Sequence, residues 1–223
     1  MALPADIAAR INPDTTALVV IDVQRRHLDT DGVGYHTLPP DRARLVTGNV
    51  GRAQAAARAA GIPVIHVGTW AKPGSRRPGH GGGNPFLRWQ NGKQIVGASF
   101  VRQTDLCTEG SVYAEFMPGT EPAPGEPVVV KFRYSGFYQT ELELLLRNYG
   151  ITDVVVAGVN SNNCVLHTSF DAQARDFGVI VLEDCCGSMN GQQYHEMGIA
   201  QIGASIGWVS SVDEFTGILE AAK

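Results

Sequence analysis

The stretch VVVAGVNSNNCVLHTSFDA, residues 154–172, begins as a run of β-branched residues and continues, after a short polar loop, with helical spacing. Similar short apolar runs recur along the chain, and segments of helical period lie between them. This alternation predicts an α/β fold, with a parallel sheet covered by helices on both faces. The expected strands are residues 17–21 (ALVVI), 63–67 (PVIHV), 128–130 (VVV), 153–157 (DVVVA), 179–182 (VIVL) and 208–210 (WVS).

Four helices are expected between these strands, each from residues that begin or end helices. Asp41 is expected to cap a long helix that ends at Gly61. Thr140 and Glu143 have the spacing of a capping box, and Gly150 closes that helix. Two more helices are expected, one from near Cys164 to Phe177 and one capped by Asn190.

A long connection interrupts the pattern between the second and third expected strands. It spans about residues 69–127 and includes the Gly/Pro-rich stretch KPGSRRPGHGGGNP at 72–85. Usual connections are roughly 2–6 residues long, so a lid or wall over a pocket is one expectation for this loop. A disordered surface insertion is the alternative for 75–83. With no linker or internal repeat evident, residues 1–223 are expected to form a single domain.

Composition and charge narrow the classes of function. The net charge is −4 with no cluster of Lys and Arg, so nucleic acid is not an expected partner. No segment approaches the roughly 18 apolar residues of a membrane span, and the first ten residues do not resemble a secretion signal. A cytoplasmic protein is therefore expected. The four cysteines have no CxxC spacing, which argues against a disulfide framework or a four-thiolate zinc site.

Three ionisable residues follow expected strands: Asp22 in VVIDVQ, Lys131 in VVVKFRYSGF and Cys164 after a short loop. The carboxyl ends of parallel strands share one edge of a sheet, where ligands commonly bind. Each residue also has a purely structural explanation, as a turn cap, a cation reaching water and a small buried side chain. Only the three together suggest a catalytic site.

Their chemistry fits hydrolysis by a cysteine nucleophile. A helix N-terminus and a nearby ammonium both favour a thiolate at Cys164, so we expect it to be ionised near neutral pH. Asp22 is expected to take the thiol proton and pass it to the leaving nitrogen, while Lys131 holds both groups in place. Backbone N–H groups of the loop from Asn160 to Cys164 are expected to form the oxyanion hole.

The segments ALVVIDVQ, VVVKFRYSGF and VAGVNSNNCVLHTSFDAQARDFG resemble the isochorismatase-like cysteine hydrolases, a superfamily that includes N-carbamoylsarcosine and biuret hydrolases. The similarity runs from about Pro13 to Leu219. It implies a Rossmann-like three-layer α/β/α sandwich with a mainly parallel six-stranded sheet, an Asp22–Lys131–Cys164 triad and a covalent acyl-enzyme. It also implies a homodimer or homotetramer and a cis peptide between Val159 and Asn160.

Two departures from members of the superfamily refine this expectation. Nicotinamidases carry a metal-binding Asp-x-His and a further His after the second strand, whereas this chain continues HVGTWA at 66–71, so neither a metal nor another cofactor is expected. True isochorismatases can lack the nucleophilic cysteine. Cys164 therefore favours a small amide, N-carbamoyl or urea-like substrate. A vinyl ether hydrolase and a catalytically idle binding protein stay open as alternatives.

Four residues near the strand ends are candidates for the substrate pocket: Trp70, Tyr134, Phe137 and His167. Core packing explains the three aromatic residues nearly as well. His66 is expected to be a hydrogen-bonded core residue. The neighbouring Cys185 and Cys186 are interpreted as a packed structural pair rather than a redox site.

Overall fold

The computed structural model describes residues 2–34, 37–71, 85 and 107–222. Their strands form one six-stranded sheet in the order β3-β2-β1-β4-β5-β6, and every neighbouring pair is parallel. The expected parallel six-stranded sheet is therefore confirmed. The strands are β1 (Thr16–Ile21), β2 (Val64–Gly68), β3 (Val128–Val130), β4 (Asp153–Val159), β5 (Gly178–Gly187) and β6 (Trp208–Ser210).

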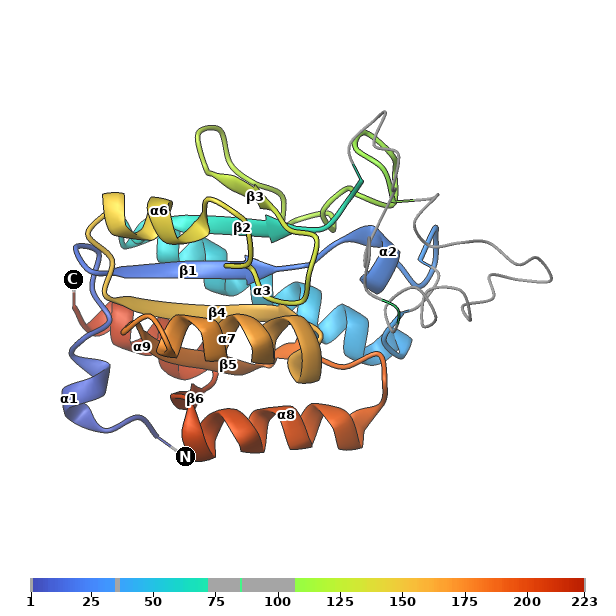
Figure 1. Ribbon diagram of the computed structural model, residues 1–223. Helices are drawn as coiled ribbons and strands as arrows, with labels where there is room; N and C mark the ends of the chain where they lie inside the picture. The colour runs from blue at the N-terminus through green and yellow to red at the C-terminus, as the bar shows by residue number, and fades with distance from the viewer. Residues whose placement is uncertain (1, 35–36, 72–84, 86–106, 223) are drawn as a thin grey trace.

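Helices cover both faces of the sheet (Figure 1). One face carries α3 (Pro40–Ala59) and α9 (Val212–Ala221). The other carries α6 (Leu142–Asn148), α7 (Leu166–Gln173) and α8 (Gln192–Ser205). Each face has its own apolar core, which confirms the three-layer α/β/α sandwich. Three short elements complete the described chain: α1 (Ala5–Ala8), α2 (Arg25–Leu28) and the π-helix η1 (Ser161–Val165).

The central strands are apolar on both sides because both faces of the sheet are covered. All six residues of β1 and all seven of β4 are buried. Sheets of this kind are built from nearly continuous apolar runs rather than from alternating patterns. This is why the six strands could be located from the sequence.

Several helix boundaries differ from those expected. The helix α3 begins at Pro40, and Asp41 lies in its first turn instead of capping it, because proline is preorganised for the first helical position. Helix α8 begins after Gly191, at φ 114°, rather than at Asn190. Helix α6 begins at Leu142, whose N–H donates to the Thr140 hydroxyl oxygen at 3.3 Å.

The fifth strand is longer than its apolar run predicted. β5 continues beyond Leu182 to Gly187, and its pairing with β4 shifts between Val156 and Gly158. Cys185 packs in the core beneath α3, and Cys186 packs in the core beneath α6, α7 and α8. Both thiols are free and fully buried, so the interpretation of this pair as structural packing is confirmed.

Among the described residues, no helix is long and apolar enough to cross a membrane. Most of the long connection expected at about 69–127, namely 72–84 and 86–106, lies outside the described residues. Its described end, residues 107–127, contacts the residues that follow β1. There Gln24 pairs with Phe116, and Arg25 N–H donates to the Glu115 carbonyl.

Candidate active site

The three residues singled out from the sequence meet at the carboxyl edge of the sheet. The Lys131 Nζ lies 2.7 Å from the Asp22 Oδ2 and donates to the Cys164 Sγ at 3.3 Å. Asp22 follows β1, Lys131 follows β3, and Cys164 lies in η1 after β4. A carboxylate, an ammonium and a thiol from remote parts of the chain are therefore in direct contact.

The site is almost closed to solvent. Lys131 is fully buried, Asp22 is 1% exposed and Cys164 is 8% exposed. Buried charges are stable only when they are paired and hydrogen-bonded, which the contact between Asp22 and Lys131 provides. The small exposed fraction of Cys164 makes it the most accessible of the three side chains.

Thr69, which the sequence analysis did not single out, completes the hydrogen bonding. Its hydroxyl donates to the Asp22 Oδ1 at 2.8 Å and accepts from the Lys131 Nζ at 2.9 Å. The Thr69 N–H in turn donates to the Oε1 of the buried Gln24 at 3.0 Å. One signal could have revealed Thr69: it directly follows β2, in the same relation to its strand as Asp22 and Lys131 to theirs.

The backbone at Asp22 is unusual. Asp22 has φ 51°, a left-handed conformation that non-glycine residues rarely adopt. Such conformations cost about 1–3 kcal/mol and cluster at functional sites. The residue before Asp22, Ile21, pairs with Gly158 on β4, where a Cβ would lie 2.0 Å from the Ile21 carbonyl oxygen. A glycine is therefore required where β4 passes the end of β1.

The charges around Asp22 keep it ionised. Burial by itself would raise its pKa, but the charges of Lys131, Arg26 and His27 hold the pKa below its ordinary range. Burial would likewise lower the pKa of Lys131, but Asp22 and Cys164 raise it. The pair is thus a carboxylate and an ammonium at neutral pH.

The expectation of an ionised Cys164 near neutral pH is wrong for the resting site. Burial raises the pKa of the Cys164 thiol to about 12; Lys131 opposes this rise, whereas the charge of Asp22 and its hydrogen bond with the thiol add to it. The cation and the helix favour a thiolate, but the burial of the sulfur and the neighbouring carboxylate outweigh them. Cys164 is therefore a thiol at rest, with a base beside it.

The loop before Cys164 has the geometry expected from the resemblance. The peptide bond between Val159 and Asn160 is cis. The Asn160 carbonyl accepts hydrogen bonds from the N–H groups of Asn163 and Val165, both at 3.0 Å, which closes the π-helical turn around Cys164. The expected role of the Asn160 and Cys164 N–H groups as oxyanion donors stays a prediction.

The four pocket candidates occupy different positions. His167 is exposed, and its Nδ1 lies 2.8 Å from the Asn163 carbonyl oxygen and its ring 5.3 Å from that of Tyr134. Phe137 is buried against Phe177, at 6.0 Å between ring centroids, which fits the packing alternative rather than a pocket wall.

Trp70 and His66 lie on the side of the sheet edge where Phe116 packs. The Trp70 ring stands edge-on to Phe116, and a Cβ on Gly68 would collide with it. His66 is fully buried with its Nε2 3.0 Å from the Glu126 Oε2, so its expected role as a hydrogen-bonded core residue is confirmed. Whether Trp70, Tyr134 or His167 contacts substrate stays a prediction.

Two further basic residues near Asp22 were missed. Arg26 and His27 lie in α2, immediately after β1, and both are buried. Buried basic residues beside a strand end are uncommon, so the sequence RRH at 25–27 offered a signal. Within the described part of the chain, no three His, Cys, Asp or Glu side chains gather as a metal site would require.

Comparisons with known proteins give the same family as the site. The isochorismatase domain model matches residues 16–214. The ureidoacrylate amidohydrolase RutB of Methylobacterium radiotolerans is 35% identical over 224 residues, which cover 98% of this chain and 84% of that protein. Such identity over nearly the whole length establishes common family membership.

Solved structures agree with the fold. A cysteine hydrolase from Pseudomonas syringae pv. phaseolicola superposes with a TM-score of 0.79 at 22% identity, covering 96% of each chain. The N-carbamoylsarcosine amidase of Thermoplasma acidophilum superposes with a TM-score of 0.67 at 24% identity, over 89% of this chain and 97% of that one. At these identities the likeness shows the fold. With the family match and the curated relative, it follows that the chain belongs to the isochorismatase-like superfamily of hydrolases.

Proposed function

We propose that this hydrolase is a cysteine amidohydrolase that cleaves a C–N bond of a small ureido, N-carbamoyl or amide compound. The observation that carries the proposal is the contact of the Cys164 Sγ with the Lys131 Nζ, at 3.3 Å, while the same nitrogen lies 2.7 Å from the Asp22 Oδ2. A nucleophile, a base and a fixed cation are the groups that such a reaction needs.

The first step forms a covalent acyl-enzyme. The Asp22 carboxylate takes the proton of the Cys164 thiol as the sulfur attacks the substrate carbonyl carbon, and the N–H groups of Asn160 and Cys164 bind the oxygen that becomes negative. Asp22 then gives its proton to the leaving nitrogen, the C–N bond breaks, and ammonia or an amine departs. A thioester to Cys164 remains.

The second step returns the enzyme to its starting state. Water attacks the thioester carbonyl, Asp22 accepts a proton from that water, and the C–S bond breaks. The departing sulfur then recovers the proton from Asp22, so the thiol and the carboxylate are restored. Lys131 stays protonated throughout and offsets whichever of the two neighbours carries the negative charge.

The surroundings of the site support a substrate with a negative charge. The charges of Arg26 and His27 reach Asp22, and Arg26 also reaches Cys107 and Lys131. The charges of these two side chains lower the pKa of Asp22, so their field at the site favours a negatively charged group. A ureido acid suits this charge, and the 35% identical relative is a ureidoacrylate amidohydrolase.

The remaining expectations are part of the same proposal. We expect one hydrolase domain over 1–223, acting on a small molecule without a metal or another cofactor, as a homodimer or homotetramer. Nucleic acid and membranes are not proposed as partners. Free thiols at Cys107, Cys164, Cys185 and Cys186 fit a reducing compartment, so the cytoplasm is the proposed location.

The test is release of ammonia or amine from a panel of ureidoacrylate, N-carbamoyl amino acids, simple amides and isochorismate. We expect turnover of a ureido or carbamoyl compound, and Cys164→Ala should lower kcat at least about a thousandfold. Cys107→Ser is the matched control, because a hydroxyl can still donate to the Thr69 carbonyl, which Cys107 contacts at 3.1 Å. Turnover of isochorismate alone, or a fully active Cys164→Ala enzyme, would refute the proposal.

A further inference from the structure

A second set of polar contacts leads away from the nucleophile loop into the opposite helix layer. The Ser161 Oγ lies 3.0 Å from the His195 Nδ1, and the His195 Nε2 lies 3.1 Å from the Arg42 Nη2. Ser161 begins η1, His195 lies in α8 and Arg42 lies in α3. We refer to these three residues as the Ser161–His195–Arg42 chain.

The direction of the hydrogen bonds in this chain is fixed by Arg42. A guanidinium has donors only, so the Nε2 of His195 must be the acceptor in their contact. The neutral ring then carries its proton on Nδ1 and donates it to the Ser161 Oγ. Burial and the charge of Arg42 lower the pKa of His195 to about 4, against the opposing charge of Glu196, so the ring is neutral at physiological pH.

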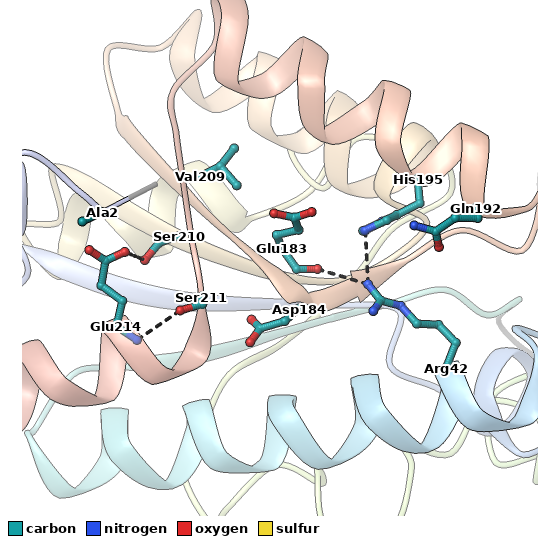
Figure 2. A pocket seen from close by; sticks show the side chains of 10 residues that line it. All are labelled: Ala2, Arg42, Glu183, Asp184, Gln192, His195, Val209, Ser210, Ser211 and Glu214. Carbon is teal, nitrogen blue, oxygen red and sulfur yellow. Dashed lines mark hydrogen bonds between the residues drawn. The ribbon is translucent and has the colours of Figure 1, made fainter.

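Arg42 is held in turn by the end of β5. Its Nη2 donates to the Cys186 carbonyl at 2.7 Å, and the Glu183 carbonyl lies 3.5 Å away. Figure 2 shows Arg42 and His195 pointing toward one another from the two helix layers, past the end of β5, where they line a cavity of about 480 Å³. The outer end of the chain is therefore anchored to backbone that belongs to the sheet.

The inner end of the chain lies in the nucleophile loop. Ser161 is fully buried and follows Asn160, whose N–H is proposed for the oxyanion hole. Helix α8 also contacts this loop directly, because a Cβ on Gly198 would lie 2.8 Å from the Ser161 carbonyl oxygen. Ser161 is the first residue of η1, so a fixed Ser161 side chain also fixes the start of this turn. Three residues later in the same turn, the Cys164 sulfur faces Lys131.

We infer that Ser161 and His195 are positioning residues, which hold η1 so that the Cys164 sulfur and the Asn160 N–H keep the orientation that attack on the substrate requires. The inference rests on the proposed role of Cys164 as nucleophile. Neither residue touches Cys164, Asp22 or Lys131 in the contacts described above. Their effect on the reaction passes through the backbone of residues 161–164.

The test compares Ser161→Ala, His195→Gln and His195→Asn in the full chain. We expect Ser161→Ala and His195→Gln to lower kcat by about tenfold with KM nearly unchanged, because the loss falls on the geometry of attack rather than on substrate binding. An asparagine amide nitrogen can take the place of Nδ1 and still donate to Ser161. His195→Asn should therefore retain most of kcat, whereas a glutamine places its amide near Nε2 instead.

Two further measurements separate positioning from general stability. Ser169→Ala is the matched control, since its hydroxyl is equally buried, in α7, and has no hydrogen-bond partner among the described residues; its kcat should equal that of the wild type. The double variant Ser161→Ala/His195→Gln should be no slower than either single variant, because both remove one interaction. Wild-type kcat in Ser161→Ala, or additive losses in the double variant, would overturn the inference.

A labelling experiment tests the positioning role separately from the proposed function. It measures the rate at which iodoacetamide modifies Cys164. This reaction needs the sulfur and Asp22 in register but needs no substrate turnover, so it can be measured even if no compound in the panel is hydrolysed. Labelling should slow in Ser161→Ala and stay unchanged in Ser169→Ala. Equal labelling rates in both variants would reject the positioning role whatever the reaction is.

Discussion

The ammonium of Lys131 has several acceptors around it, and the Thr69 hydroxyl is one that also donates to Asp22. The Thr69 hydroxyl accepts from Lys131 and donates to Asp22, so it fixes the distance between the base and the cation. A threonine in this position is thus part of the geometry of the base. Its role explains why a residue with no acid–base chemistry of its own is fully integrated into the site.

We predict that Thr69→Val lowers kcat about tenfold and destabilises the fold by about 1–3 kcal/mol, because a buried acceptor and a buried donor each lose a partner. The valine keeps the shape of the side chain, so packing is preserved. Steady-state kinetics and urea unfolding measure the two effects. Thr69→Ser keeps the hydroxyl and should behave like the wild type; wild-type kinetics in Thr69→Val together with a loss in Thr69→Ser would assign the effect to the methyl group instead.

The pKa of Cys164 leads to a prediction in which two readouts move in opposite directions. Burial is the largest cause of the raised thiol pKa, about 12 in the wild type, and the charge of Asp22 adds to it. Asp22→Asn removes that charge, although its amide oxygen can still accept a hydrogen bond, so thiolate should form at lower pH than in the wild type. Turnover should nevertheless fall about a hundredfold or more, because the proton carrier is lost.

The ultraviolet absorbance of the thiolate, followed as pH rises, measures the first readout for Cys164. Subtracting the same titration of Cys164→Ser removes the contribution of the other three thiols, which are also buried. A thiolate that appears at the same pH in Asp22→Asn and the wild type would show that the carboxylate does not control the thiol. A variant that kept full turnover would remove Asp22 from the mechanism.

At the scale of elements, the site depends on how closely β4 passes the end of β1. Gly158 pairs with Ile21, and its φ of 124° is one that side chains rarely adopt. Asp22 directly follows Ile21 along the chain, and the residues that follow β4 lead to Cys164. The close approach of these two strands therefore sets the distance between the base and the nucleophile loop.

We predict that Gly158→Ala destabilises the protein by at least about 3 kcal/mol, since the added methyl would meet the Ile21 carbonyl oxygen and the backbone conformation would become strained. Gly48→Ala in α3 is the matched control, because no atom of the described part of the chain lies within 4 Å of the added Cβ. In that helix the change should stabilise by up to about 1 kcal/mol. Chemical denaturation of both variants measures these changes. Equal midpoints for Gly158→Ala and the wild type would show that the close approach of β4 to Ile21 does not require a glycine.

The elements show which features the sequence could predict. Strands β1, β2 and β4 were located because a sheet buried on both faces requires continuous apolar runs. The extension of β5 past Leu182 was missed because Glu183 and Asp184 end the apolar run, although the shifted pairing with β4 carries the strand onward. The π-helical turn at η1 was also missed, since no sequence pattern distinguishes it from the first turn of a helix.

For the whole molecule, the sequence predicted which groups meet but not the charge state in which they meet. Asp22, Lys131 and Cys164 could be placed because the ends of parallel strands share one edge. The state of the thiol could not, because it depends on burial and on a competing carboxylate that sequence spacing does not measure. The roles of Ser161 and His195 could not be predicted either, because they follow from contacts between distant segments. Thr69 was missed although its position directly after β2 offered a signal.

The association of several copies of the chain would need apolar side chains that are exposed on its surface. Ile199 and Ile202 of α8, and Ile206 directly after it, are buried in the chain's own core and are not available to a second chain. The exposed apolar side chains of α8 are Tyr194 at 41% and Met197 at 65%, and Phe170 on α7 is 59% exposed. The homodimer or homotetramer stays a prediction; light scattering during gel filtration should give two or four chains, and a monomer would contradict it.

Stability of the whole fold should fall as pH falls below about 6.5, because two buried histidines resist protonation. The pKa of His195 is lowered to about 4 by burial and Arg42, and burial lowers that of His66 despite its bond to Glu126. The unfolded chain binds protons at these residues below about pH 6.5 while the folded chain does not, so the free energy of unfolding declines with falling pH. For His195 the loss is on the order of 2–3 kcal/mol when pH 4 is reached.

The variant His195→Gln separates this contribution from that of the carboxylates. The glutamine does not titrate. The urea midpoint of the variant should therefore vary less between pH 6.5 and 4 than that of the wild type, even if the variant is less stable at every pH. Below that window Glu126, whose pKa is lowered to about 2 although its burial opposes this, and Asp22 add further losses in both proteins as they are protonated. Parallel pH curves for the two proteins between 6.5 and 4 would show that the folded and the unfolded chain bind the His195 proton over the same pH range, and the neutral ring assigned to the Ser161–His195–Arg42 chain would then be wrong.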